Sequence, residues 1–263
     1  MTARRTLALV LLSGLGMPTP AHAYTTKHTA RGDTVRWTQA EVELVLDDSL
    51  RRALPRGAAA EALALAAEAW RGFGGPDLVV DDATPSVPYR TGDGHHGVYL
   101  LDDWPFQEGL LAVTATTYDE STGRIVDADI LVNAAQRFAM ARPGEPLDPG
   151  VYDLGSVLTH EAGHVLGLGE TEDDRMATMW PDIGAGDLHQ RTIEEDDAAG
   201  ILSIYSDVVL APPMAGCTGA RVARGGVGAG SLLWVLAALA LLALWNRRRR
   251  PGRHPGRVRG VLE

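Results

Sequence analysis

The sequence has little cysteine and few basic residues over most of its length. Cys217 is the single cysteine among 263 residues. An internal disulfide, a cysteine-rich zinc site and a CxxC redox motif each need at least two cysteines, so all three are excluded. Residues 24–207 hold 13 basic against 33 acidic side chains. A body this acidic repels phosphate backbones, so we expect no nucleic-acid partner.

An apolar fraction of 45% argues against a disordered chain. Residues 24–207 are long enough for one hydrophobic core, and we expect this single domain to be monomeric. The remaining residues, at the two ends, have the composition of targeting segments.

Residues 1–23 have the pattern of a secretory signal peptide. Arg4 and Arg5 precede a short apolar run, and the small residues Ala21 and Ala23 stand at the positions expected for cleavage. The apolar run is too short to span a bilayer, which favours a signal peptide over an anchor. We therefore predict that the body is exported.

Residues 225–246 form the second targeting segment. No charged residue occurs in this stretch, its length matches the hydrocarbon core of a membrane, and four arginines follow at 247–250. Clustered arginines stay on the cytoplasmic side. We predict a transmembrane segment at 225–246, preceded by a linker at 208–224 and followed by a basic cytoplasmic tail at 247–263, with the catalytic domain outside the cytoplasm.

The body alternates between strand and helix patterns, which predicts a mixed α/β domain. An Ala- and Leu-rich helix is expected at 58–71, a helix capped by Asp153 at 153–166, and a last helix capped by Thr192 that ends at Ile204. Strands are expected at 42–46, 78–80, 98–101, 110–118 and 125–132.

The decisive motif is His160-Glu161-Ala162-Gly163-His164, inside the predicted helix at 153–166. Residues four apart project from one helical face, so both imidazoles can reach one metal ion. Glycines after His164 allow a sharp turn that returns Glu170 as a third ligand. Two nitrogens and one carboxylate suit a catalytic zinc with an open position for water, and Glu161 can take the proton of that water.

Other carboxylates in the sequence are alternatives for the third ligand. Glu172, Asp173 and Asp174 are nearby substitutes for Glu170. In a gluzincin-type metallopeptidase the third ligand would instead come from the later helix, as Glu194 or Glu195. A surface protein that binds metal or protein without catalysis is the alternative from another functional class.

The extended string around this motif resembles the metzincins, whose third ligand after HExxHxxGxx is usually His and sometimes Asp; Glu170 departs from that pattern. More of the body resembles the matrixin branch, since Met179 followed by Trp180 and Pro181 matches its methionine turn. The closing helix before Tyr205 is similar too. The resemblance implies a zinc endopeptidase with a twisted, mostly parallel five-stranded sheet, one antiparallel edge strand, an active-site helix and a C-terminal helix.

The resemblance also implies how a peptide or protein substrate binds. The main chain of Leu111, Ala112 and Val113 would pair with it as the edge strand, and the segment from Trp180 and Pro181 to Arg191 would wall the pocket beyond the scissile bond. Matrixins often carry structural zinc or calcium. The groups available for such ions are Asp93, His95, His96, Asp127 and Asp129, although a solvated loop and surface carboxylates are the simpler interpretation.

Cys217, within a small-residue turn before the apolar stretch and the arginines, resembles the hallmark position of a myxobacterial-type C-terminal sorting tail. That resemblance implies that a membrane protease cuts the tail and that the protein is displayed at the cell surface or released. A plain single-pass anchor is the alternative. We expect no upstream cysteine switch for latency, because Cys217 follows the domain.

Overall fold

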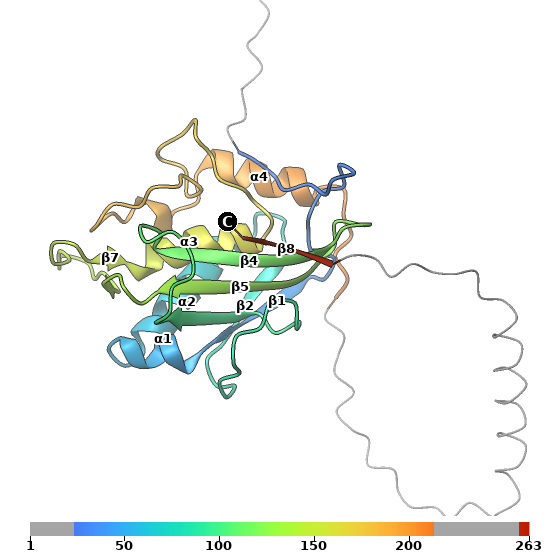
Figure 1. The fold of residues 1–263 in the computed structure, drawn as a ribbon. Helices are drawn as coiled ribbons and strands as arrows, with labels where there is room; N and C mark the ends of the chain where they lie inside the picture. The colour runs from blue at the N-terminus through green and yellow to red at the C-terminus, as the bar shows by residue number, and fades with distance from the viewer. Residues whose placement is uncertain (1–23, 213–257, 263) are drawn as a thin grey trace, which may run out of the picture.

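A twisted sheet carries the fold, with strands in the order β2-β1-β3-β5-β4-β8 (Figure 1). The computed structural model describes residues 24–212 and 258–262. The strands are β1 (Glu41–Leu46), β2 (Asp77–Asp81), β3 (Gly97–Leu101), β4 (Ala112–Asp119), β5 (Ile125–Asn133) and β8 (Val258–Leu262). β1, β2, β3 and β5 are parallel, and β4 is antiparallel to β5. The predicted fold class is thus confirmed for β1 to β5.

Strand β8 adds a sixth strand that the sequence pattern did not predict. It runs antiparallel to β4 and pairs with Ala115 through Asp119, as the red ribbon beside β4 shows (Figure 1). These residues belong to the segment expected to be a cytoplasmic tail. The first residues of β4, from Ala112 to Thr114, are left without a β8 partner.

Helices α2 and α3 pack against each other and against the sheet. The helices are α1 (Asp48–Ala53), α2 (Ala58–Ala69), α3 (Leu154–Val165), α4 (Glu195–Tyr205) and the 3-10 helix η1 (His189–Arg191); two short strands, β6 (Phe138–Ala139) and β7 (Tyr152–Asp153), pair with each other. The main core lies between these helices and the sheet, where alternate residues of β1, Val42 and Leu44, are buried.

Local sequence explains where α3 begins and ends. The carboxylate of Asp153 accepts a hydrogen bond from the Ser156 amide, as predicted for the cap of this helix. Gly167 has a φ of +97°, and a Cβ there would lie 2.7 Å from the Val35 carbonyl oxygen. Glycine therefore permits both the sharp turn after the helix and the close approach of the chain near Val35.

The predicted cap of the last helix is wrong. Helix α4 begins after Glu194, whereas Thr192 has extended backbone and ends η1. The carboxylate of Asp197 accepts the Glu194 amide at 3.0 Å, and the Thr192 carbonyl accepts the Thr178 hydroxyl at 2.8 Å. The carboxylate in the first turn, rather than the threonine, therefore satisfies the amide at the start of this helix.

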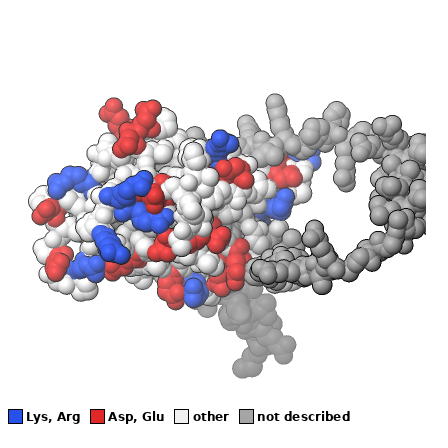
Figure 2. All heavy atoms as spheres, turned by 90° about the horizontal axis from the view of Figure 1, so that it is seen from below, with Lys and Arg blue, Asp and Glu red and all other residues white. Residues whose placement is uncertain are grey.

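On the face seen in Figure 2, acidic and basic side chains are interspersed. The predicted signal peptide at 1–23, the apolar stretch at 225–246 and Cys217 lie outside the described residues. Among residues 24–212 and 258–262, no helix has the length and apolar character needed to cross a membrane.

Candidate zinc centre and active-site cleft

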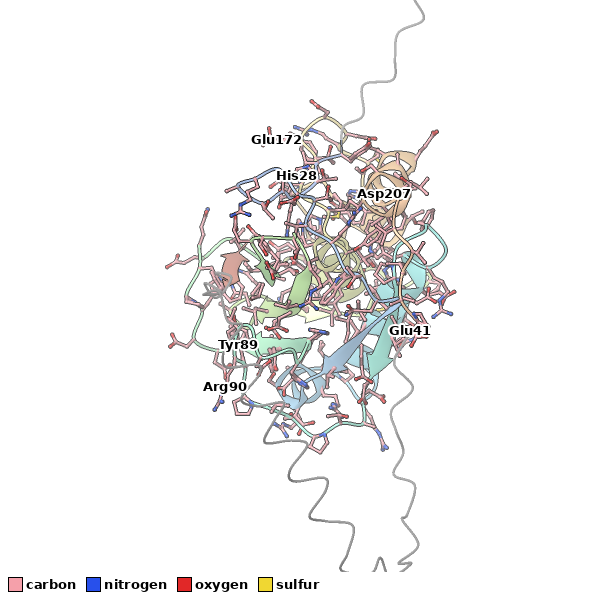
Figure 3. The ribbon with its side chains drawn as sticks, turned by 90° about the vertical axis from the view of Figure 1, so that its right-hand side faces the viewer. His28, Glu41, Tyr89, Arg90, Glu172 and Asp207 are labelled. Atoms are coloured by element: carbon pink, nitrogen blue, oxygen red, sulfur yellow. The ribbon has the colours of Figure 1, made fainter. Side chains whose placement is uncertain are left out.

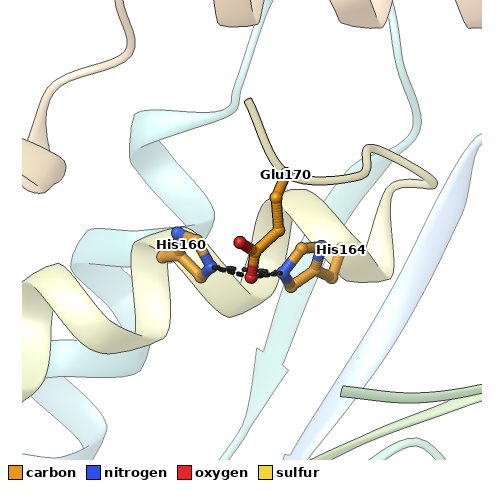
Figure 4. A group of neighbouring side chains, drawn as sticks. All are labelled: His160, His164 and Glu170. Carbon is orange, nitrogen blue, oxygen red and sulfur yellow. Dashed lines mark hydrogen bonds and ion pairs between the residues drawn. The ribbon is translucent and has the colours of Figure 1, made fainter. Parts of the chain in front are cut away.

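His160 and His164 lie one helical turn apart on α3 and direct their rings toward each other. Their Nε2 atoms are 3.1 Å apart, and both side chains are almost fully buried (Figure 4). The carboxylate of Glu170 approaches from the turn after α3, with Oε1 3.9 Å from each Nε2 atom. The structure thus brings together the three residues that the sequence suggested as ligands.

Backbone carbonyls fix the orientation of both imidazoles. His160 Nδ1 lies 2.8 Å from the Thr178 carbonyl oxygen, and His164 Nδ1 lies 3.0 Å from that of Leu168. Since a carbonyl only accepts, each Nδ1 carries the proton and donates it. The lone pair of each ring is then on Nε2, the atom that faces Glu170, as in histidines that hold a metal.

The electrostatic surroundings keep both rings neutral. Burial is the main cause that lowers the pKa of His160 to about 4; the hydrogen bond to the Thr178 carbonyl opposes it, and the nearby charge of Lys27 adds to it. Burial, His160 and Lys27 together hold the pKa of His164 well below its ordinary value. Neutral imidazoles at neutral pH have the free lone pairs that metal coordination requires.

The chain near Thr25 holds the turn that carries Glu170. The Gly169 amide donates to the Thr25 carbonyl at 3.0 Å, and the Thr25 hydroxyl donates to the Glu170 carbonyl at 2.5 Å. A Cβ on Gly169 would lie 2.4 Å from the Thr25 hydroxyl oxygen. Glycine at 169 therefore allows this close approach, which sets the position of Glu170.

These three side chains fit a zinc ion. Tetrahedral zinc with ligand bonds of about 2.0–2.2 Å places ligand atoms roughly 3.4 Å apart, and the distances in the site lie on either side of that value. His, Cys, Asp and Glu side chains whose ligand atoms lie close together can hold a metal ion. Among the described residues, the one group of three or more consists of His160, His164 and Glu170, whose ligand atoms lie within 4.8 Å of one another. Glu172, Asp173, Asp174, Glu194 and Glu195 are not part of that group, and Figure 3 shows Glu172 at the outer edge of the molecule.

Glu161 is buried beside the two histidines and touches β4. The Thr114 hydroxyl donates to Glu161 Oε2 at 2.5 Å, and both side chains are at most 5% exposed. The carboxylate therefore lies on the side of the cleft formed by β4. This is the position that the prediction of a proton carrier requires.

A cleft of about 170 Å³ opens over the site. Its lining includes the three candidate ligands and Glu161, together with Gly109, Leu110, Leu111, Ala112, Tyr152, Val157, Pro181, Asp182 and Ile183. Of the predicted substrate-binding residues, Leu111, Ala112 and Pro181 thus reach the cleft. Val113 and Trp180 do not line it, and the Arg175 guanidinium lies over the Trp180 ring. A larger cavity of about 540 Å³, near Leu54 and Phe138, contains no predicted site residue.

Met179 lies directly beneath α3. A Cβ on Gly163 would be 2.3 Å from its sulfur, and Met179 is 1% exposed. The amides of Thr178 and Met179 donate to the carboxylate of Asp197, whose pKa is raised by burial despite these bonds. Because the Thr178 carbonyl also accepts from His160, this turn connects α4 to the candidate ligands.

The groups suggested for additional metals make separate contacts. The His96 ring lies 2.9 Å from an Asp127 oxygen, whereas the His95 amide donates to Asp93. Asp129 accepts the Gly97 amide at 3.0 Å. A structural zinc or calcium ion at these residues stays a prediction.

Comparison with known proteins identifies the family. A model described as Matrixin matches residues 21–206. The chain belongs to the matrixin family. Matrixins are zinc-dependent endopeptidases, and the chain is similar to two metalloendoproteinases of Arabidopsis thaliana.

Metalloendoproteinase 1-MMP is 32% identical over 133 residues, which cover 48% of this chain and 32% of that protein. Metalloendoproteinase 4-MMP is 34% identical over 113 residues, which cover 43% of this chain and 29% of that protein. The matched part therefore spans about a third of the length of these relatives.

Three residues at the site were missed by the sequence analysis. Thr25 and Lys27 come from the segment directly after the predicted signal peptide, and Thr114 from β4. Lys27 is the single lysine of the chain, and this rarity could have marked it as a residue of interest. A buried threonine on a strand has no such signal, because its partner lies 47 residues away.

Proposed function

We propose that this matrixin is an exported zinc-dependent endopeptidase. The observation that supports this most directly is the opposition of the two Nε2 atoms, 3.1 Å apart, with the Glu170 carboxylate facing both. Zinc in such a site supplies a Lewis acid that polarises the scissile carbonyl and lowers the pKa of water. His160, His164 and Glu170 would hold this ion.

Residues of the protein would bind the substrate and transfer the proton. An extended peptide would add to β4 beside Leu111, Ala112 and Val113, which aligns its carbonyl with the cleft. Glu161 would accept a proton as the water oxygen bonds to the carbonyl carbon. It would then deliver that proton to the amide nitrogen as the C–N bond breaks, so that the products are an amine and a carboxylic acid, which keeps the second proton of the water until it ionises.

The variant Glu161→Gln tests this function. It should retain one zinc per chain and lose peptide hydrolysis by roughly 10²- to 10⁴-fold, the usual contribution of a general base. Glu68→Gln, on the exposed face of α2, is the matched control and should cleave at the wild-type rate. Zinc binding without cleavage of any peptide-library substrate by the wild-type protein would support the non-catalytic alternative instead.

Export rests on the pattern at 1–23, and surface attachment on the patterns at 217 and 225–246. If residues 225–246 spanned a membrane, residues 258–262 and β4 of the same chain would lie on opposite sides of it. In the structure these two segments pair with each other. An epitope placed after Glu263 distinguishes the two arrangements. Protection of the epitope from protease added to whole cells supports the anchor, whereas accessibility of the epitope contradicts it.

A further inference from the structure

The Thr114 side chain makes a short contact with Glu161 beside the cleft. The hydroxyl oxygen lies 2.5 Å from Glu161 Oε2 and 3.2 Å from the Glu161 carbonyl oxygen. Thr114 is fully buried, and Glu161 is 5% exposed. A hydroxyl that donates to a carboxylate over 2.5–2.7 Å makes a strong, charge-assisted hydrogen bond. The shorter contact therefore determines where the hydroxyl proton points.

The two partners differ in how firmly their positions are set. Thr114 is in register with Ile130 in the antiparallel β4–β5 pair, and threonine has a restricted χ1 torsion. Glu161 has three side-chain torsions, and its terminal torsion is broad. The sheet thus supplies a fixed donor to the more flexible of the two side chains. Ala112, two residues before Thr114, lines the same cleft.

We infer that Thr114 is a positioning residue for Glu161 and that it acts through the hydrogen bond to Oε2. This inference rests on the proposed function, in which Glu161 carries the proton. The hydroxyl holds the carboxylate toward the cleft, beside the strand to which substrate would add. The strand β4 then positions both the main chain of the substrate and the carboxylate of Glu161. A peptide that binds to β4 is therefore held at a fixed distance from Glu161.

Thr116 provides an internal comparison. It lies on the same face of β4 and is also fully buried, but its hydroxyl oxygen has no hydrogen-bond partner among the described residues. Burial on this strand is therefore compatible with a hydroxyl that bonds nothing. The hydroxyls of Thr114 and Thr116 differ in their relation to Glu161, which makes the pair a matched test.

The experiment compares Thr114→Val, Thr114→Ser and Thr116→Val in the full chain. Valine keeps the shape of threonine without the hydroxyl, and serine keeps the hydroxyl. We expect Thr114→Val to lower kcat about 10- to 100-fold, the cost of a misplaced catalytic group, with KM changed less than about threefold. Thr114→Ser should restore kcat to within about fivefold of wild type, and Thr116→Val should leave it unchanged.

Two readouts separate positioning from a structural role. Zinc content and the thermal midpoint of the metal-free protein should be alike for Thr114→Val and Thr116→Val. The inference is overturned if both valine variants lose the same activity, if serine fails to rescue, or if the loss follows zinc content or stability. Glu161→Gln distinguishes the two proposals: an active Glu161→Gln ends the proposed function, whereas an inactive one with fully active Thr114→Val ends only this inference.

Discussion

The guanidinium of Arg191 forms an ion pair with the carboxylate of Asp153, and its Nε donates a hydrogen bond to Oδ2 over 2.6 Å. Asp153 is fully buried and caps α3, and Arg191 ends the segment that follows the cleft wall. Burial opposes the charge of Asp153, but the bonds from Arg191 and from the amides of Ala141 and Ser156 outweigh it, so its pKa lies below the ordinary value. One ion pair therefore joins η1, which follows the cleft wall, to the active-site helix.

Replacing Arg191 should be costly. Arg191→Ala leaves a buried carboxylate without its cation, and breaking such a pair reduces the free energy of unfolding by about 3–5 kcal/mol. Urea unfolding measures this loss. Arg52→Ala is the matched control, because Arg52 pairs with Asp48 on an exposed helix and should change stability little. Equal effects of the two variants would show that the buried pair contributes no more than a surface one.

Gly163 sets the distance between α3 and the methionine turn. An added Cβ would lie 2.3 Å from Met179 Sδ and 2.8 Å from Trp70 Cζ2. Alanine favours helix by about 1 kcal/mol, yet overpacking of this size costs about 1–3 kcal/mol. We therefore expect Gly163→Ala to lower the thermal midpoint and the zinc affinity together.

A double-mutant cycle checks the cause of this effect. In the background of Met179→Ala, the sulfur contact is gone, so Gly163→Ala should cost less than it does in the wild-type protein. Additive losses of unfolding free energy would show that Met179 is not the neighbour that alanine disturbs.

Glu170 should determine zinc affinity. Loss of a residue that only supports a ligand typically lowers metal affinity 10–100-fold, so loss of the ligand itself should exceed about 100-fold. Glu170→Ala should show this in competition with a zinc chelator. Glu172→Ala is the control on the same loop, and Glu194→Ala tests the gluzincin arrangement. A greater loss in Glu194→Ala than in Glu170→Ala would contradict the assignment of the third ligand.

The sequence pattern predicted those helices and strands that are specified by their own residues, through a repeating apolar pattern or a capping side chain. The alternation at Val42 and Leu44 and the cap at Asp153 both specify their own element, and the structure confirms both. The cap at Thr192 was wrong because Asp197 competes for the same amide. Strand β8 was missed because its pairing with β4 depends on residues more than a hundred positions away.

At the site, too, features set by neighbouring residues were predicted and features set by distant residues were not. His160 and His164 are one helical turn apart, so their approach follows from the helix alone. The Glu170 turn depends on Thr25, and the orientation of Glu161 on Thr114. Those contacts join segments that are distant in sequence, and only the folded chain brings them together.

Asp129 lies on β5 and is fully buried. Burial raises the pKa of its carboxyl to about 8; the bond from the Gly97 amide lowers it in part, and the charges of Asp127 and Asp93 raise it. An unfolded chain would ionise this group near its ordinary value of 3.8. Between these two pH values the folded protein keeps a proton that the unfolded chain releases. The contribution of Asp129 to the free energy of unfolding should therefore fall as pH rises from about 4 to about 8, by up to about 1.4 kcal/mol per pH unit, and level off above.

Asp129→Asn removes this titration and keeps an oxygen that can accept the Gly97 amide. The variant should match the wild-type stability near pH 4 and exceed it at pH 8, by an amount on the order of a few kcal/mol. Urea unfolding across this range measures it, with chelator present because zinc binding is itself pH-dependent. Asp102→Asn, at an exposed carboxylate, is the control and should follow the wild-type curve. Parallel curves for wild type and Asp129→Asn would mean that Asp129 is already ionised in the folded protein at neutral pH.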